Sequence, residues 1–437
     1  PLPPAEPAPD AALATPYAIS VSADDRTLVA TAASSDVLFT VDAASGAVLG
    51  RVAVGAVPRG VALESAADGA APRAWVLNAV DNSVSLVDLT DRTQQQLAAT
   101  IPLDDPTHLV VKLGRVAFST ARASTGGTFS CESCHPDGHT DQLLWVLDTP
   151  VCNVAGCTQV PPRSTMPIRG LRDTAPYHWD GIPGDPYGGA NTANIGTAVT
   201  ANCDPLVPES CTRELLDGTL ATTMCLVDDC PINDEGLPGA LDATERDALA
   251  RFLLSVPYPP AQRRSYNNVL STTATTGFRV FHIDGVPGDQ PGDRANVCGN
   301  CHRLPFWVST NTPGTGMDAP TWRGAYDRWL ILPQGRWNVV DRRRQSERDA
   351  GFPERNMWGA AFGVQVPFWN MVTEGSTGFS GAYARTLTLS RSTATAELTS
   401  DLLAALELAD QEGAVFLQGE GVSVSYTHLT LPTNREV

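Results

Sequence analysis

Short runs of alternating apolar and polar residues fill the first hundred positions of the chain and occur in two copies. Alternation with a period of two is typical of strands that have one buried face. The first copy starts at Pro16 and the second at Pro58, which gives a repeat of 42 residues. The pattern predicts strands at 16–21, 24–29 and 37–42 in the first copy and at 58–63, 74–78 and 82–88 in the second.

Strand repeats of this length indicate the blades of a β-propeller. The two copies resemble blades of the seven-bladed YVTN, or surface-layer, type over residues 16–103. A closed ring normally needs about four to eight blades, so two blades form an incomplete propeller. We expect the remaining blades upstream of this sequence. A small domain of β-hairpins is the alternative.

From residue 104 onward, apolar residues recur at helical spacing. The stripe at 109–118 predicts a helix ahead of Cys131. The segment Gly-Arg-Val-Ala-Phe at 114–118 has a counterpart in Gly-Phe-Arg-Val-Phe at 277–281, ahead of Cys298. The sequence therefore predicts a mainly helical domain that occurs twice.

The ends of two further helices can be recognised. Asp242 and Glu245 make a capping box ahead of an apolar stripe, and the proline-rich segment 257–260 ends that helix. We place a domain boundary there. A last helix is predicted over about 400–410, with Gly413 just beyond its end.

Two copies of Cys-x-x-Cys-His, at 131–135 and 298–302, carry the clearest chemistry in the chain. This spacing is the attachment signature of c-type haem. Two thiols add across the vinyl groups of one porphyrin, and the adjacent histidine binds the iron. The sequence therefore predicts two covalently bound haem c groups, with attachment through Cys131, Cys134, Cys298 and Cys301 and with His135 and His302 as proximal iron ligands.

Cys-x-x-Cys pairs also occur in zinc sites and in dithiol redox sites. The second pair reads Cys-Gly-x-Cys-His, with Gly299 after the first cysteine, and so is similar to thioredoxin-type motifs. Both pairs share the histidine that follows directly, which favours haem over either alternative.

Length, composition and charge limit the number of domains and the classes of binding partner. The 437 residues are enough for two to four domains, and a hydrophobic content of 42% is ample for buried cores. The formal net charge is −18, which disfavours nucleic acid and anionic membrane surfaces and favours a basic redox protein. No apolar run is long enough for a transmembrane segment.

The other six cysteines lie between residues 152 and 230. Their even number indicates disulfides, of which the simplest set pairs neighbours: Cys152 with Cys157, Cys203 with Cys211, and Cys225 with Cys230. Disulfides and c-type haem both indicate an oxidising compartment. We therefore expect a periplasmic or extracytoplasmic protein whose export signal is missing from the sequence before Pro1.

An Arg-Gly-x-x-Asp element follows each haem motif, at 169–173 and 323–327. Three motifs follow one another in the first domain: Cys-x-x-Cys-His, then Pro-x-Arg-Gly, then Ala-Pro-Tyr-x-Trp-Asp-Gly at 175–181. This order is similar to that of the bacterial di-haem cytochrome c peroxidase and MauG family. The resemblance covers about residues 104–416. The resemblance implies that Trp179 relays electrons between the haems. It also implies that one haem receives electrons while the other reduces peroxide.

The chain departs from this family where distal ligands are usually found. No histidine lies between His139 and His178, and residues 332–337 read Leu-Pro-Gln-Gly-Arg-Trp where the family often has His-Asp-Gly. From the residues alone, the distal candidates are Met166 and His178 for the first haem and Met317, Met357 and Met371 for the second; His139 follows His135 too closely to be favoured. Each methionine, and His178, could instead fill a core.

Charged residues suggest two further sites. Arg169 and Arg323 could hold haem propionates, or could pair at the surface with Asp173 and Asp327. The acidic stretch 228–235 could bind calcium, which the family resemblance implies between domains. Its spacing fits no calcium loop, and a solvated loop tied by a disulfide is the favoured alternative.

Residues 424–433 resemble the translation of a transposase adapter used in sequencing libraries, and we assign them no function. A natural strand is the alternative, and His428 is excluded as a haem ligand in either case. If the tail is an adapter, the genuine chain continues past about Gly421.

The expected architecture is multidomain. It consists of a linker at 1–15, two β-propeller blades at 16–103, two mainly α cytochrome c-type haem domains at 104–260 and 261–416, and a truncated or artefactual tail at 417–437. The first haem domain contains a disulfide-rich insertion.

The expected function is that of a di-haem oxidoreductase that passes electrons between two haems and reduces hydrogen peroxide or a related small oxidant. The first alternative is a non-catalytic electron-transfer protein in which the propeller docks a partner. Oxidative modification of a partner protein, which the MauG resemblance allows, is a further alternative.

Overall fold

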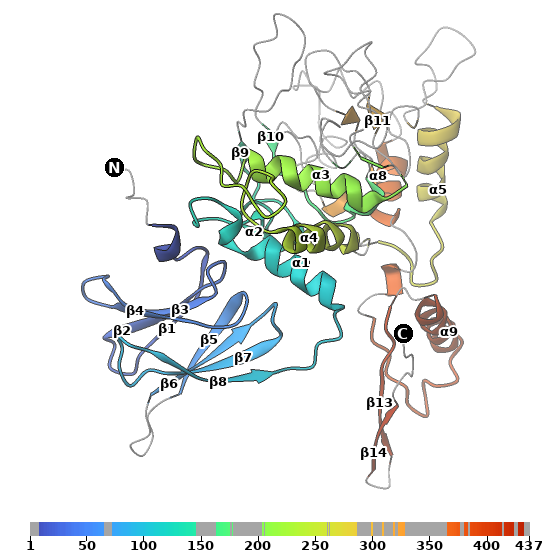
Figure 1. Ribbon diagram of the computed structural model, residues 1–437. Coiled ribbons are helices and arrows are strands. Elements are labelled where there is room, and N and C mark those ends of the chain that lie inside the picture. Colours follow the sequence, from blue (N-terminus) through green and yellow to red (C-terminus); the bar gives the residue numbers. More distant parts are fainter. Residues whose placement is uncertain are drawn as a thin grey trace, which may run out of the picture. The chain divides into compact units, whose positions relative to one another are not determined.

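The structure is a computed structural model of the 437-residue chain (Figure 1). It describes residues 8–64, 72–145, 163–174, 177, 203–204, 206–259, 261, 263–285, 299, 308–309, 318–319, 322–327, 365–375, 380–382, 385–412, 415–423 and 427–431. The chain divides near Pro257 into two compact units. Unit 1 holds the described residues up to Pro257, and unit 2 holds most of those that follow.

Unit 1 begins with two four-stranded antiparallel sheets, drawn in blue in Figure 1. In both sheets the strands lie in the order of the chain, as in a propeller blade. The first sheet contains β1 (Pro16–Val21), β2 (Thr27–Ala32), β3 (Val37–Asp42) and β4 (Val48–Ala53), and the second contains β5 (Pro58–Glu64), β6 (Arg73–Asn78), β7 (Ser83–Asp88) and β8 (Gln96–Pro102). The prediction of two repeated blades agrees with this part of the fold.

The two sheets share an apolar core. Val29 and Leu38 of the first sheet pack in one cluster with Val76 and Val87 of the second, and all four are almost completely buried. The Ser20 hydroxyl of β1 donates a hydrogen bond to the Val61 carbonyl of β5 (3.1 Å). Burial of apolar area therefore joins the blades, and β1 lies beside β5 as inner strands of adjacent blades do.

The sequence pattern missed one strand in each sheet. All seven residues of β8 are exposed, so the strand has no buried face and no alternation of apolar and polar residues. β4 was also missed, and none of its side chains is fully buried. β2 begins at Thr27 and not at residue 24, because Ser22 donates to the Asp24 carboxylate in a turn that precedes the strand.

Two carboxylates hold the linker between the blades. Asp36 accepts a hydrogen bond from the Val57 amide (2.8 Å), and Asp81 accepts one from the Ala56 amide (2.6 Å). Val57 has a φ of 57°, in the left-handed region that a β-branched residue rarely adopts. The paired acceptors help to stabilise this unusual backbone between β4 and β5.

Asp36 gives a prediction about pH. Its burial, reinforced by the charge of Asp81, raises the pKa of Asp36 above its ordinary value of 3.8. The folded carboxyl therefore binds its proton more tightly than the unfolded one, so its contribution to stability is present at low pH and is lost as pH rises through the folded pKa. We expect Asp36→Asn, measured by urea unfolding between about pH 3 and pH 7, to become more stable relative to wild type as pH rises.

Asp42 is the matched control for Asp36. It is partly exposed, and hydrogen bonds from Ser45 lower the pKa of Asp42. Its stabilisation is therefore present above pH 3.8 and is lost as pH falls through the folded pKa. Asp42→Asn should show the opposite trend, and equal trends in the two variants would contradict the assignment.

Three helices complete the core of unit 1. They are α1 (Leu109–Ser119), α3 (Pro208–Ala221) and α4 (Ala243–Ser255). Both predicted helices, α1 and α4, are confirmed. The capping box of α4 is present, with a 2.9 Å bond from the Glu245 amide to Asp242 and a 3.1 Å bond in return. Two short strands, β9 (Leu144–Trp145) and β10 (Arg163–Ser164), pair antiparallel.

Unit 2 is built on α5 (Thr272–Arg279), which continues into a π-helical turn at Val280–Asp284 and packs against α8 (Gln365–Glu374). The predicted last helix is α9 (Glu397–Gln411), which starts three residues earlier than expected. Short strands occur at β11 (Val308–Ser309) and β12 (Asp318–Ala319). In the tail, β14 (Thr427–Leu431) pairs with β13 (Gly419–Ser423), so the segment that contains His428 forms a strand.

The two units repeat one helix crossing. Gly114 of α1 lies so close to α4 that an added β-carbon would overlap the Ala248 carbonyl. Gly277 of α5 has the same relation to the Pro367 carbonyl of α8. The duplication predicted from 114–118 and 277–281 therefore matches a shared contact between backbones.

The Arg-Gly-x-x-Asp elements also share a conformation. Gly170 (φ 76°) and Gly324 (φ 70°) are both left-handed, and a short 3-10 turn follows each one, at Leu171–Asp173 and Ala325–Asp327. Glycine is the residue that adopts this conformation at least cost. The repeated element is thus a structural turn as well as a sequence motif.

Candidate functional site

The first Cys-x-x-Cys-His motif forms one short helical turn, α2 (Cys131–Cys134). The Ser130 amide donates to the Ser133 hydroxyl at its start (3.0 Å), and the His135 amide donates to the Cys131 carbonyl at its end (2.9 Å). Both cysteines and the histidine are thereby held on a single fixed segment.

Neither thiol of this turn is in a disulfide. Burial raises the pKa of Cys131 to about 12, and burial with the nearby charge of Asp141 raises the pKa of Cys134. Both side chains are therefore neutral thiols at neutral pH, whereas zinc binding and dithiol exchange use thiolates. Within the described ranges, no three His, Cys, Asp or Glu side chains are grouped as a metal site.

His135 is half-buried beside the turn. Burial lowers the pKa of His135, although the backbone of Met166 and the charge of Asp141 act in the opposite direction. Its Nδ1 atom is buried and has no hydrogen-bond partner among the residues that the structure describes. A neutral imidazole is the form that binds iron, so the ring and the two thiols fit the chemistry of a c-type haem.

The β-sheets reach this turn directly. Arg59 of β5 pairs with Glu132, between the two cysteines, and with Asp137 just after the motif (2.8 Å). The buried hydroxyl of Ser34, between β2 and β3, lies 3.2 Å from that of Ser130. The blades therefore support the residues at the start and in the middle of the motif.

Arg59 gives a prediction about stability. Its guanidinium and the Glu132 carboxylate are mostly buried, so loss of the guanidinium leaves a carboxylate without its partner. We expect Arg59→Gln to lower the free energy of unfolding by about 1–3 kcal/mol, measured by urea denaturation. Arg73→Gln, at an exposed position of β6, is the control and should change it by about 0.5 kcal/mol or less. Equal effects would contradict a supporting role for Arg59.

Arg169 contacts the turn from another segment. Its Nε and Nη2 atoms both donate to the Asp137 carbonyl, at 3.1 and 3.0 Å. The Ile168 amide donates to the Gly138 carbonyl (3.0 Å). Arg169 therefore lies at the predicted haem site, where its contacts with the backbone fix the loop after His135. Whether it also holds a propionate stays a prediction.

Only Gly299 of the second motif belongs to the described residues. It lies against His282: a β-carbon added to Gly299 would be 3.0 Å from His282 Cδ2. Arg323 is buried, and its guanidinium lies over the ring of Tyr258 (5.4 Å to the centroid). Met371 is buried in the core between α5 and α8, as its alternative role of core filling requires.

Several predicted site residues lie outside the described ranges, so their roles stay predictions. They are Cys298, Cys301, His302, His178, Trp179, Met317 and Met357.

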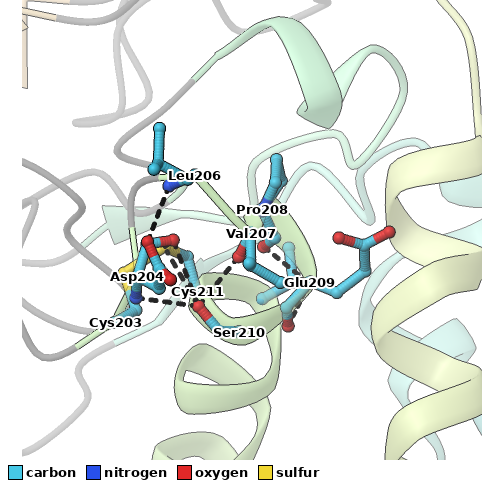
Figure 2. Close-up of a disulfide and its surroundings, with 9 residues drawn as sticks. Cys203, Asp204, Leu206, Val207, Pro208, Glu209, Ser210 and Cys211 are labelled. Carbon is cyan, nitrogen blue, oxygen red and sulfur yellow. Dashed lines mark hydrogen bonds between the residues drawn. A yellow bond between two sulfur atoms is a disulfide. The ribbon is translucent and has the colours of Figure 1, made fainter.

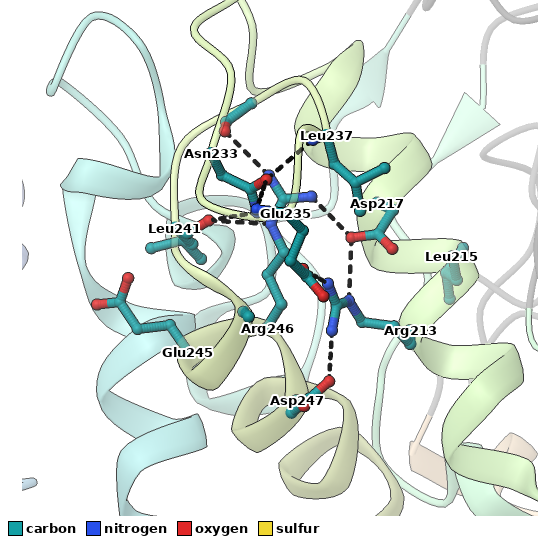
Figure 3. Close-up of polar contacts among 12 residues, drawn as sticks. Arg213, Leu215, Asp217, Asn233, Glu235, Leu237, Leu241, Glu245, Arg246 and Asp247 are labelled. Atoms are coloured by element: carbon teal, nitrogen blue, oxygen red, sulfur yellow. Dashed lines mark hydrogen bonds and ion pairs between the residues drawn. The ribbon is translucent and has the colours of Figure 1, made fainter.

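Arginines hold the segment that follows the acidic stretch, and one of them pairs with Glu235 at the end of the stretch (Figure 3). The buried guanidinium of Arg246 donates to the four carbonyls of residues 238–241 (2.9–3.1 Å) and to Asp217 (2.8 Å). Arg213 pairs with Asp217, Glu235 and Asp247. Guanidinium groups thus bind Glu235 and the carbonyls of the segment that follows the stretch, and calcium binding by residues 228–235 stays a prediction.

Two predicted disulfides are present, Cys203–Cys211 and Cys225–Cys230. Figure 2 shows the first, at the start of α3, where the Ser210 hydroxyl accepts from the Asp204 amide (2.9 Å) and donates to the Val207 carbonyl (2.8 Å). Cys152 and Cys157 lie outside the described residues.

Sequence reasoning missed Arg59 and His282. No local signal distinguishes Arg59, because its partners are more than 70 residues away. His282 directly follows the repeated segment 277–281, so a comparison of the two copies would have placed it opposite Ser119.

No protein-family model matches the chain, and no curated protein matches it. Two solved structures of hydrazine synthase from Kuenenia stuttgartiensis are similar to it in part. One chain is 35% identical over 21% of this chain and 24% of its own length, with a TM-score of 0.18. Another, from a crystal pressurised with 20 bar xenon, is 18% identical over 62% of this chain and 88% of its own length, with a TM-score of 0.35. This chain thus spans about a quarter of the length of the first hydrazine synthase chain. TM-scores this low support no conclusion about function, and the resemblance to di-haem peroxidases stays a prediction.

No helix in the described parts of the chain is both long and apolar enough to cross a membrane.

Proposed function

We propose that this protein is an extracytoplasmic di-haem c-type oxidoreductase that passes electrons between two haems and reduces hydrogen peroxide or a related oxidant. The observation that carries the proposal is the repeated Cys-x-x-Cys-His motif, which follows a repeated helix–helix contact at Gly114 and Gly277. The short helical turn of the first motif, whose two thiols are in no disulfide, supports it. The two disulfides support the compartment, and the charge of −18 supports a basic redox partner.

The roles follow from the motif. Cys131 and Cys134 would attach the first haem, with His135 as its proximal ligand, and the motif at 298–302 would hold the second. A bound haem iron supplies one-electron redox chemistry. The chain itself fixes the first turn between Arg59 and Arg169 and keeps the imidazole neutral. By resemblance, Trp179 would relay electrons between the two sites.

Counting haems tests the proposal. Protein made in a host that attaches haem c should contain two haems per chain, measured by pyridine haemochrome absorbance after acid extraction. Replacing Cys131 and Cys134 with alanine should leave one haem, and so should replacing Cys298 and Cys301. Replacing Cys225 and Cys230, which form a disulfide, is the control and should leave two. Extracted protein without porphyrin absorbance would reject the proposal.

Peroxide turnover tests the second part of the proposal, which is the reduction of hydrogen peroxide. The reduced holoprotein should be oxidised by hydrogen peroxide faster than free haem c, and electron paramagnetic resonance should show a high-spin ferric haem before or after one-electron reduction. Two haems that are always six-coordinate, without peroxide turnover, would favour the non-catalytic electron-transfer alternative.

A further inference from the structure

A hydrogen-bonded tryptophan and histidine lie beside the second haem motif. Trp322 Nε1–H donates to His282 Nε2 at 3.1 Å. His282 Nδ1 lies 2.9 Å from the Phe278 carbonyl oxygen. A carbonyl can only accept, so Nδ1 carries the proton and Nε2 is left with its lone pair for the indole. The two bonds therefore fix His282 as one neutral tautomer.

The surroundings keep the imidazole neutral. The His282 ring lies between the rings of Phe278 and Phe281, at centroid distances of 4.2 and 4.8 Å. Burial lowers the pKa of His282, although its bond to the Phe278 carbonyl acts in the opposite direction. His282 also lies in the π-helical turn that ends α5, and such turns occur frequently at functional sites. The indole N–H of Trp322 is thus hydrogen-bonded to His282 Nε2, an imidazole nitrogen that carries no proton.

The pair lies next to the predicted attachment turn. A β-carbon added to Gly299 would be 3.0 Å from His282 Cδ2 and 3.3 Å from the Phe281 carbonyl, so His282 lies close to Gly299. Gly299 directly follows Cys298. An oxidant held beside Gly299 would therefore be close to His282, which is hydrogen-bonded to the Trp322 indole.

The first domain has no such pair at the equivalent positions. Alignment of 114–118 with 277–281 places Ser119 opposite His282, and alignment of 169–173 with 323–327 places Ile168 opposite Trp322. A serine and an isoleucine are neither a readily oxidised ring nor a base. The duplicated scaffold therefore carries the pair in its second copy and not at the matching place in its first.

We propose that Trp322 and His282 form a relay in which electron and proton leave the indole together. The inference rests on the proposed function for its oxidant, the second haem after a peroxide has taken electrons from it. That oxidant accepts one electron from the indole, the Trp322 Nε1–H bond breaks, and the proton bonds to His282 Nε2. The products are a neutral indolyl radical and an imidazolium, and one electron from the donor protein, with return of the proton, restores the pair.

Photo-oxidation of the holoprotein tests the relay. Tris-bipyridine ruthenium(III), generated by a laser flash, serves as a one-electron oxidant from outside, and the radical is followed by transient absorbance and freeze-quench electron paramagnetic resonance. We expect a neutral indolyl radical that forms more slowly in heavy water than in water. Trp322→Phe should abolish it. His282→Gln keeps an acceptor oxygen but removes the base, and should lower the radical yield about tenfold or more.

Trp369 provides the control. Its indole nitrogen is buried and has no hydrogen-bond partner among the described residues, so Trp369→Phe should leave the radical unchanged. A radical that survives Trp322→Phe, or a yield and isotope effect unchanged by His282→Gln, would overturn the proposal. The isotope effect on the wild-type protein needs no variant to fold. Because ruthenium supplies the oxidant, failure of peroxide turnover would reject the proposed function alone, and peroxide turnover without this radical would reject the relay alone.

Discussion

Arg246→Met should lower the free energy of unfolding of unit 1 by about 3–5 kcal/mol. The guanidinium is completely buried and donates to Asp217 and to the four carbonyls of residues 238–241. Methionine fills much of the same volume but has no donor. The carbonyls of residues 238–240 would therefore lose this donor, the Leu241 carbonyl would keep only its bond from Asn233, and Asp217 would lose one of its two arginines.

Urea unfolding followed by far-UV circular dichroism measures this loss. Arg251→Met is the matched control, because Arg251 lies on the same helix but is exposed, and it should change stability by about 0.5 kcal/mol or less. Arg246→Lys should recover only part of the loss, since an ammonium cannot reproduce the planar set of donors. A methionine variant as stable as wild type would show that the loop does not need the guanidinium.

The second large effect is expected at Gly114. We expect Gly114→Ala to destabilise unit 1 by about 3 kcal/mol. The added methyl group would overlap the Ala248 carbonyl and lie 2.6 Å from Phe252 Cβ. Neither group can move aside without shifting α4, so the two helices would have to separate.

Gly218→Ala provides the contrast. Gly218 lies in α3 of the same unit, and an added β-carbon there would meet nothing within 4 Å. Alanine is the better helix former, so this variant should be more stable by up to about 1 kcal/mol in the same urea experiment. If both substitutions changed stability in the same direction, close packing against α4 would not be the reason that position 114 requires glycine.

The sequence predicted those elements that have one buried face or an explicit cap. Alternation located β1, β3 and β7 to within a residue, and the capping box located α4. It could not locate β8, because an exposed edge strand has no reason to alternate. The helix α3 was missed as well; its start is held by Pro208 and a disulfide and not by a side-chain cap.

The first Cys-x-x-Cys-His motif could be located from the sequence because its spacing is local, and haem attachment there stays a prediction. Its supports could not, because Arg59 and Ser34 reach it from distant segments of the sheets. The same limit applies to the hydrogen bond between Trp322 and His282, which joins residues 40 positions apart. Local patterns report covalent chemistry and backbone periodicity, whereas such contacts depend on the tertiary fold.

The contacts of Arg59 and Ser34 with the first motif also bear on the order of biogenesis. Cys131 is only partly exposed in the folded chain, and the residues on either side of it, Ser130 and Glu132, are already engaged by the sheets. An enzyme that attached porphyrin to Cys131 and Cys134 would act on an extended segment. We therefore expect attachment to precede packing of the sheets against the motif, so the rate of that packing would set the time available for cofactor insertion.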